Sequence, residues 1–236
     1  MEWLTSTRYA HRGLHDRAKG VPENSLAAFE SAAAAGYGIE LDARLSADGE
    51  PVVFHDRTLD ALTDQTGPVA AHSTEDLTQI RLLGTSEAIP RLEEALQRVN
   101  GRVPVLVEIK SHNEPIGPLE NAVCDAINAY KGPSGILSFN PHSVRWYRDH
   151  APLIPRGRTI IGLRASSGGM PLWRRLVLRM SAAPIRCDPD FLAYDLPALP
   201  ARKPGLPIIA WTVRTPEDQA MAEKSADSFI FEDMKP

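Results

Sequence analysis

The chain has 236 residues, of which 43% are hydrophobic and 24% charged, and its formal net charge is -4. These fractions exclude a disordered or fibrous chain, and the acidic balance argues against a nucleic-acid partner. No apolar run approaches the roughly 20 residues that cross a bilayer, and the first residues lack the basic start and apolar stretch of a signal peptide. We therefore expect a cytoplasmic protein without stable membrane association.

Short β-branched or apolar runs alternate along the chain with longer segments of helical spacing. We predict strands at residues 8–11, 38–42, 51–55, 103–110, 135–139, 159–164, 185–188, 207–213 and 228–233. We predict helices at residues 25–35, 91–99, 118–129, 141–150, 171–180 and 215–224. Asn24 is the expected N-cap of the first helix, and Gly36 is expected to close its C-terminal end.

This alternation of strands and helices predicts the fold. It indicates parallel strands joined by crossover connections. If residues 51–55 extend the unit before them, about eight units remain, which is the number that closes a barrel. An open doubly wound sheet also fits, but no glycine-rich dinucleotide fingerprint follows the first strand. We expect residues 1–236 to form one α/β domain, a TIM-type (β/α)8 barrel with a short insertion after the second strand unit.

Ionisable side chains lie at the ends of the early strands, where a barrel carries its chemistry. They are His11, Arg12, Glu40, Asp42, His55, Glu108 and Lys110. Alternate residues of a strand share a face, so Glu40 lies beside Asp42 and Glu108 beside Lys110. On the inner face of a barrel an unpaired charge is costly, so these groups need partners.

A divalent cation held by Glu40, Asp42 and Glu108 would remove the repulsion between the three carboxylates. Ligands made only of oxygen favour Mg²⁺ or Ca²⁺ over zinc. Arg12 and Lys110 then remain as cations for an anionic substrate, and a phosphate suits both the metal and the guanidinium.

Histidine is the side chain that can change its charge near neutral pH, so His11 and His55 are candidates for general base and general acid. We assign His11 as the base and His55 as the acid. The attacking oxygen is either water or a hydroxyl of the substrate itself, which would give a cyclic phosphate.

A series of motifs appears in a fixed order: Ala10-His11-Arg12-Gly13, Pro22-Glu23-Asn24-Ser25, Glu40-Leu41-Asp42, Asp48-Gly49, Val52-Val53-Phe54-His55-Asp56 and Glu108-Ile109-Lys110. Weaker matches follow at residues 89–96, 138–139 and 211–213. The series resembles the glycerophosphodiester phosphodiesterase family. The resemblance implies a (β/α)8 barrel that uses a divalent cation to hydrolyse glycerophosphodiesters to glycerol 3-phosphate and an alcohol.

The resemblance also implies roles for single residues. It makes His11 and His55 the acid–base pair, Glu40, Asp42 and Glu108 the metal ligands, Arg12 and Lys110 the phosphate clamp, Glu23 and Asn24 the residues that brace the site, and Trp211 a wall for the glycerol or the leaving alcohol. Among the departures from the family pattern, Arg214 stands where asparagine is common, and Phe231-Glu232-Asp233 replaces a more usual threonine–aspartate. The stretch from Asp56 to Gly101, which varies in the family, is short here.

Other interpretations remain open. A lysophospholipase D or a cyclising lyase can use the same polar groups, and a non-catalytic barrel can bind phosphodiesters. Glu40 and Asp42 can instead pair with Arg44 on an exposed strand. The basic, amphipathic residues 170–180 suit either a lipid surface or, as we expect, an ordinary barrel helix. The oligomeric state is not predicted.

Overall fold

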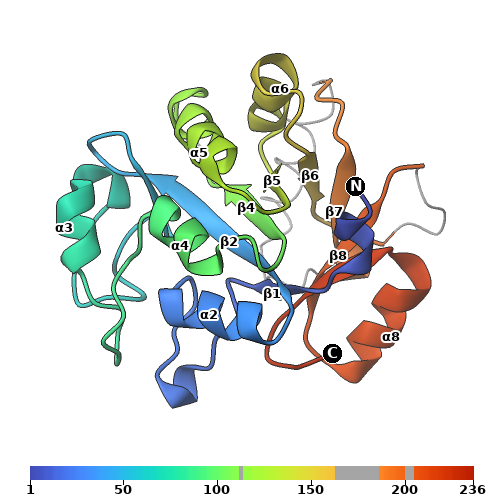
Figure 1. The fold of residues 1–236 in the computed structure, drawn as a ribbon, viewed down its shortest axis with the longest axis horizontal. Helices are drawn as coiled ribbons and strands as arrows, with labels where there is room; N and C mark the ends of the chain where they lie inside the picture. The colour runs from blue at the N-terminus through green and yellow to red at the C-terminus, as the bar shows by residue number, and fades with distance from the viewer. Residues whose placement is uncertain (112–113, 163–185, 200–204) are drawn as a thin grey trace.

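Eight parallel strands form a closed barrel in the computed structural model, which describes residues 1–111, 114–162, 186–199 and 205–236 (Figure 1). The strands are β1 (Tyr9–His11), β2 (Gly38–Leu45), β4 (Val105–Ile109), β5 (Ser134–Ser138), β6 (Arg156–Ile160), β7 (Phe191–Asp195), β8 (Ile208–Val213) and β9 (Ser228–Phe231). They follow the order β1-β9-β8-β7-β6-β5-β4-β2, and β1 also pairs with β2, which closes the ring. The predicted TIM-type barrel is confirmed.

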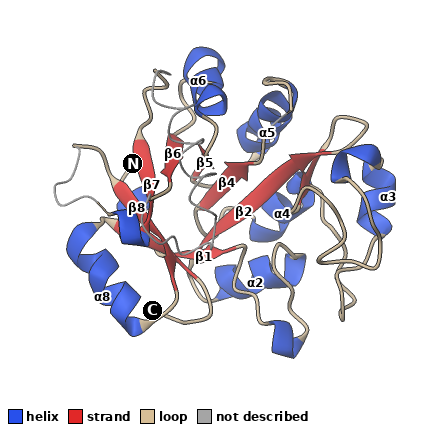
Figure 2. Ribbon diagram, turned by 180° about the vertical axis from the view of Figure 1, so that it is seen from behind, coloured by secondary structure: helices blue, strands red, loops and turns tan. Residues whose placement is uncertain are grey.

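Helices surround the strands (Figure 2). They are α2 (Leu26–Ala34), α4 (Leu92–Val99), α5 (Pro118–Ala129), α6 (Pro141–His150) and α8 (Pro216–Ser225). All five lie within a residue of the predicted ranges. The predicted N-cap of α2 is wrong. Ser25 rather than Asn24 caps the helix, because the Ser25 hydroxyl accepts the hydrogen bond from the Ala28 amide at 3.1 Å. Asn24 has a left-handed backbone and directs its side chain into the barrel instead.

The predicted positions of β6 and β7 are wrong. β6 begins three residues before the predicted range 159–164, and the polar residues at its start concealed it in the sequence. In the structure Arg156 pairs with Asp190, and Gly157 leaves room for the Phe191 ring. Residues 186–188 of the predicted strand 185–188 form no strand, and β7 follows at Phe191. Residues 163–164, residue 185 and the predicted helix 171–180 lie outside the described residues.

A short insertion follows β2, as predicted. It begins with β3 (Pro51–Val53), which pairs antiparallel with the end of β2, and contains η2 (Val69–Ala71) and α3 (Thr74–Gln79). Figure 1 shows α3 at the periphery, away from β5 to β8. The insertion has a hydrophobic cluster of its own, which includes Phe54, Leu59, Leu77 and Leu82. Asp48, at the turn between β2 and β3, accepts hydrogen bonds from the Thr74 amide and hydroxyl and so fixes α3 to the barrel.

The amino-terminal end of the barrel is packed with apolar side chains. Leu4, from the short helix α1 (Trp3–Ser6), is fully buried against residues of the strand interior, among them Tyr9, Leu106 and Phe191. The polar residues therefore gather at the other, carboxyl end of the strands. Two further short helices, η1 (Arg17–Lys19) and η3 (Leu196–Ala198), lie in loops. None of the described helices is long and apolar enough to cross a membrane.

Candidate active site

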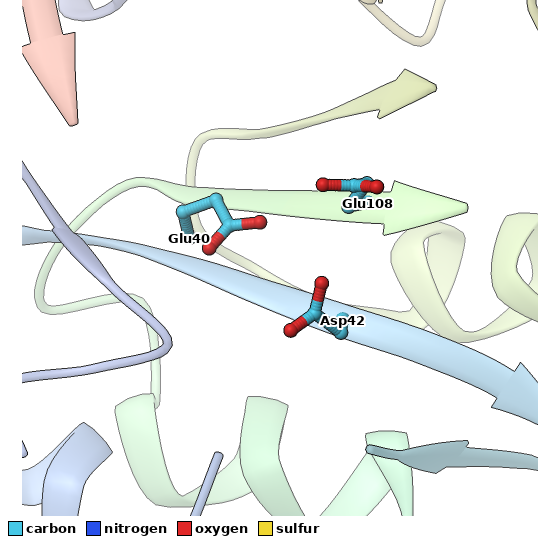
Figure 3. A group of neighbouring side chains, drawn as sticks. All are labelled: Glu40, Asp42 and Glu108. Carbon is cyan, nitrogen blue, oxygen red and sulfur yellow. The ribbon is translucent and has the colours of Figure 1, made fainter. Parts of the chain in front are cut away.

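Three buried carboxylates meet inside the barrel. Glu40 and Asp42 lie two residues apart on β2 and share its inner face, and Glu108 stands beside Asp42 in the register of β4. Each offers an oxygen within 4.8 Å of the others, and the side chains point toward one space (Figure 3). At most 7% of any of the three residues is exposed. Burial and the two neighbouring carboxylates raise the pKa of Glu40 well above its usual range.

Lys110 supplies one positive charge to this cluster. Its Nζ lies 2.9 Å from Asp42 Oδ1 and 2.7 Å from Glu108 Oε1. Burial opposes the charged form of Lys110, but these two carboxylates raise its pKa nevertheless. Burial would also raise the pKa of Asp42, but Lys110, His55 and Arg12 together hold it well below its usual range.

The donor set fits a hard divalent cation. Apart from the contacts with Lys110, no hydrogen bond from the described residues reaches Asp42 Oδ1 or Glu108 Oε1, and both atoms are buried. All the offered donors are carboxylate oxygens, which suit Mg²⁺ and Ca²⁺. The cluster can therefore hold a divalent ion.

Arg12 follows β1 in a left-handed turn, with φ 54°. Its amide donates to Glu40 Oε2 at 3.2 Å, while Nη1 lies 2.5 Å from Glu23 Oε1 and Nε lies 3.3 Å from Asp42 Oδ2. Gly13, the next residue, also has a positive φ, and a Cβ there would come within 2.9 Å of the Ala28 backbone. The turn therefore requires glycine after Arg12, and it places the guanidinium between two carboxylates.

Asn24 orients Asp42. Its Nδ2 donates to Asp42 Oδ2 at 2.8 Å, and its Oδ1 accepts from the Asp42 amide at 3.3 Å. Like Arg12, Asn24 has φ 54°, and its own amide donates to the Arg12 carbonyl oxygen. These bonds leave Oδ1 of Asp42 directed at Lys110 and the other carboxylates.

His55 lies just after β3, and its Nδ1 is 2.7 Å from Asp56 Oδ1. The hydrogen bond from His55 lowers the pKa of Asp56. Arg44 lies on β2, two residues after Asp42. It donates hydrogen bonds to the His55 carbonyl oxygen at 2.9 and 2.7 Å and to the Lys110 carbonyl oxygen at 3.4 Å. Arg44 thus ties two candidate residues together, a role that sequence reasoning missed, and the strand that carries Glu40 and Asp42 is buried rather than exposed.

His11, the last residue of β1, lies between Glu40 and Glu232, the residue that follows β9. Its Nε2 is 3.9 Å from Glu40 Oε2, and its Nδ1 is 3.2 Å from Glu232 Oε1. Burial lowers the pKa of His11, and Glu232 opposes that shift. Sequence reasoning gave Glu232 no role. The alternation of Ser228, Ile230 and Glu232 along the inner face of β9 was the signal that could have found it.

Trp211 extends from β8 toward Phe139, beside β5. The ring centroids are 5.5 Å apart and the planes meet at 85°. Because β6 and β7 separate β5 from β8 in the sheet, this edge-to-face contact crosses the barrel interior. The two rings therefore pack edge to face inside the barrel.

The chain is similar to known phosphodiesterases over almost its whole length. The sequence profile of the glycerophosphoryl diester phosphodiesterase family matches residues 11–234. A glycerophosphodiester phosphodiesterase from Caldanaerobacter subterraneus is 32% identical over 239 residues, which cover 95% of this chain and 93% of the relative.

Two solved structures show the same fold. A phosphodiesterase from Oleispira antarctica, in complex with the product sn-glycerol-3-phosphate, has a TM-score of 0.76 at 22% identity, over 95% of this chain and 92% of its own. A glycerophosphodiester phosphodiesterase from Thermotoga maritima has a TM-score of 0.68 at 24% identity, over 95% and 94%. The chain is a phosphoric diester hydrolase and belongs to the glycerophosphoryl diester phosphodiesterase family.

Proposed function

We propose that the chain hydrolyses glycerophosphodiesters to glycerol 3-phosphate and an alcohol, with one Mg²⁺ or Ca²⁺ ion and with His11 and His55 as the acid–base pair. The observation that carries this proposal is the meeting of three buried carboxylates, two imidazoles and two cationic side chains at the carboxyl end of one barrel. We also propose that residues 1–236 work as a single domain in the cytoplasm, where the two free cysteines, Cys124 and Cys187, would stay reduced.

Glu40, Asp42 and Glu108 would hold the divalent cation. When bound, the cation would draw negative charge from the phosphoryl oxygens. Asn24 keeps Asp42 in place for this task, because it bonds both the side chain and the amide of that residue. Glu23 would act on the cation site indirectly, through Arg12, because its ion pair is with that residue.

Arg12 and Lys110 bind the phosphate. The Arg12 guanidinium presents parallel N–H donors that match two phosphoryl oxygens, whereas the Lys110 ammonium acts as a point charge. Arg12 lies between Glu23 and Asp42, so its guanidinium is held beside the carboxylates that would bind the cation. Trp211 and Phe139 lie across the barrel and would contact the glycerol or the alcohol.

The two histidines each have Nδ1 engaged by a carboxylate, so each leaves Nε2 for the substrate. Glu232 Oε1 lies 3.2 Å from Nδ1 of His11 as a charge contact, and Asp56 Oδ1 makes a 2.7 Å hydrogen bond with Nδ1 of His55. His11, closer to Glu40, would take the proton from the attacking oxygen. His55 would give a proton to the departing alcohol.

The reaction is tested with glycerophosphocholine and glycerophosphoethanolamine in water enriched in ¹⁸O. We expect glycerol 3-phosphate with one ¹⁸O on phosphorus, as direct attack by water requires. A cyclic glycerol phosphate that appears first would assign the attack to the substrate's own hydroxyl and make the enzyme a cyclising lyase. Release of choline from lysophosphatidylcholine but not from glycerophosphocholine would indicate a lysophospholipase D. Binding of the diesters without turnover would identify a non-catalytic barrel.

A further inference from the structure

A second charged cluster lies at the rim of the barrel beside the metal-site carboxylates, where the ends of β1, β8 and β9 meet. At its centre is Glu232, directly after β9, with 11% of its side chain exposed. Oε1 lies 3.2 Å from His11 Nδ1 and 3.3 Å from His15 Nε2, and Oε2 pairs with Arg214. One carboxylate therefore joins two imidazoles and a guanidinium.

The backbone places this carboxylate firmly. Glu232 follows Ser228 and Ile230 on the inner face of β9, and its amide donates to the Val213 carbonyl oxygen at 2.9 Å. Arg214, one residue after that carbonyl, is itself held at the start of α8, where its amide donates to Asp218 Oδ2 at 3.0 Å. Arg214 and Glu232 thus pair with each other from the ends of two neighbouring strands.

The charge of Glu232 is also secured. Burial would raise its pKa, but His11, His15 and Arg214 together hold the pKa far below its usual range. The carboxylate is thus ionised at neutral pH and accepts hydrogen bonds only. An imidazole whose Nδ1 faces such an acceptor carries its proton on Nδ1 and keeps the lone pair on Nε2.

We propose that Glu232 is a positioning residue, which fixes the ring orientation and tautomer of His11 so that Nε2 faces the carboxylate cluster and the substrate. Arg214 holds the second oxygen of Glu232 and keeps the carboxylate aimed at His11. His15 shares Oε1 from the loop that follows β1. This inference rests on the proposed function, because it acts through the role of His11 as a base.

The first test compares kinetics of Glu232→Ala with those of the wild-type enzyme on glycerophosphocholine at saturating cation. We expect kcat to fall about tenfold to a hundredfold, the range found when an oriented histidine loses its partner, while KM changes less than about twofold. Glu232→Gln guards against misfolding, because it keeps the shape of the side chain and an amide oxygen that can accept from Nδ1, but not the charge. The kcat of this variant should fall about threefold to tenfold. Glu217→Gln, the same change at an exposed site on α8, is the matched control and should keep the wild-type kcat.

The second test separates positioning from a structural role. In a His11→Ala background, Glu232→Ala should cause no further loss of kcat, because a residue that acts through His11 has nothing left to act on. The ring ¹⁵N signals of His11 should show the Nδ1–H tautomer in the wild-type protein and lose it in Glu232→Ala.

Two results overturn the inference alone: an equal loss of kcat from Glu232→Ala in the His11→Ala and wild-type backgrounds, or a His11 tautomer that does not respond to the variant. Near-native kcat in His11→Ala would instead overturn the proposed role of His11, and the inference with it.

Discussion

Lys110 gives the sharpest test of the buried charges, because its Nζ contacts two of the three carboxylates at 2.7 and 2.9 Å and only 6% of its side chain is exposed. Lys110→Met removes the ammonium and keeps most of the stem. In protein freed of metal, Asp42 and Glu108 would then face each other and Glu40 without the ammonium, and Arg12 would be the closest remaining cation, 3.3 Å from Asp42. Loss of one partner from a buried ion pair costs about 3–5 kcal/mol, and we expect a loss of this size.

Saturating Mg²⁺ or Ca²⁺ should reduce this loss. The uncompensated carboxylates of the variant attract a dication more strongly than those of the wild-type protein do. If the variant binds the cation tenfold more tightly, the difference in the free energy of unfolding narrows by about 1.4 kcal/mol. Urea unfolding in EDTA and in excess cation measures both values.

Lys19→Met is the matched control. Lys19 also pairs with a carboxylate, Asp16 at 2.6 Å, but 79% of its side chain is exposed. Its replacement should cost little stability, with or without cation, because solvent screens an exposed pair. A loss for Lys110→Met that is as small as the control, or that is the same in EDTA and in excess cation, would refute the assignment of these carboxylates to a shared cation site.

Three further predictions concern other residues. Arg12→Lys should lower kcat more than about tenfold with little change in KM, because an ammonium lacks the parallel N–H donors that match two phosphoryl oxygens. Normal turnover per folded molecule together with a lower Tm would show that Arg12 only pairs with Glu23 and does not act on the phosphate. His11→Ala and His55→Ala should each lower kcat about 10²–10⁴-fold on a diester with a poor leaving group, and each should remove one limb of the pH–rate profile; near-native turnover would end the role of that histidine. Hydrogen bonds from Ser46 and Thr74 lower the pKa of Asp48 to about 2, so the stability from its ionised form is complete above pH ~4 and is lost as the pH falls toward 2. Asp48→Asn should therefore make the urea midpoint less sensitive to pH between pH 4 and 2, and an unchanged pH dependence would contradict the anchoring of α3 by this carboxylate.

The early half of the barrel was predictable from sequence because each strand ends in a recognisable motif. Alternation on a strand placed Glu40 beside Asp42 and Glu108 beside Lys110, and the structure has both arrangements. Helices were predicted well where proline at the first turn marks their start, as in α5 and α6.

The later half was harder to predict, for a physical reason. β6 begins with Arg156-Gly157-Arg158, whose polarity hides a strand. That strand becomes evident only from its contacts with the neighbouring strands β5 and β7, such as the Gly157–Phe191 packing. Glu232 was missed because its partners lie more than 200 residues earlier in the chain, at His11 and His15. Closure of the barrel brings β1 and β9 together, and no local pattern announces that contact.

The most direct test of the central claim is turnover of glycerophosphocholine by enzyme whose metal content has been measured after treatment with EDTA. We expect no release of glycerol 3-phosphate from metal-free enzyme and recovery on titration with Mg²⁺ or Ca²⁺. We also expect a higher half-saturating cation concentration in Glu108→Gln, because that variant loses one of the three carboxylate ligands. Full turnover by enzyme shown to be free of metal would contradict the assignment of Glu40, Asp42 and Glu108 to a catalytic cation.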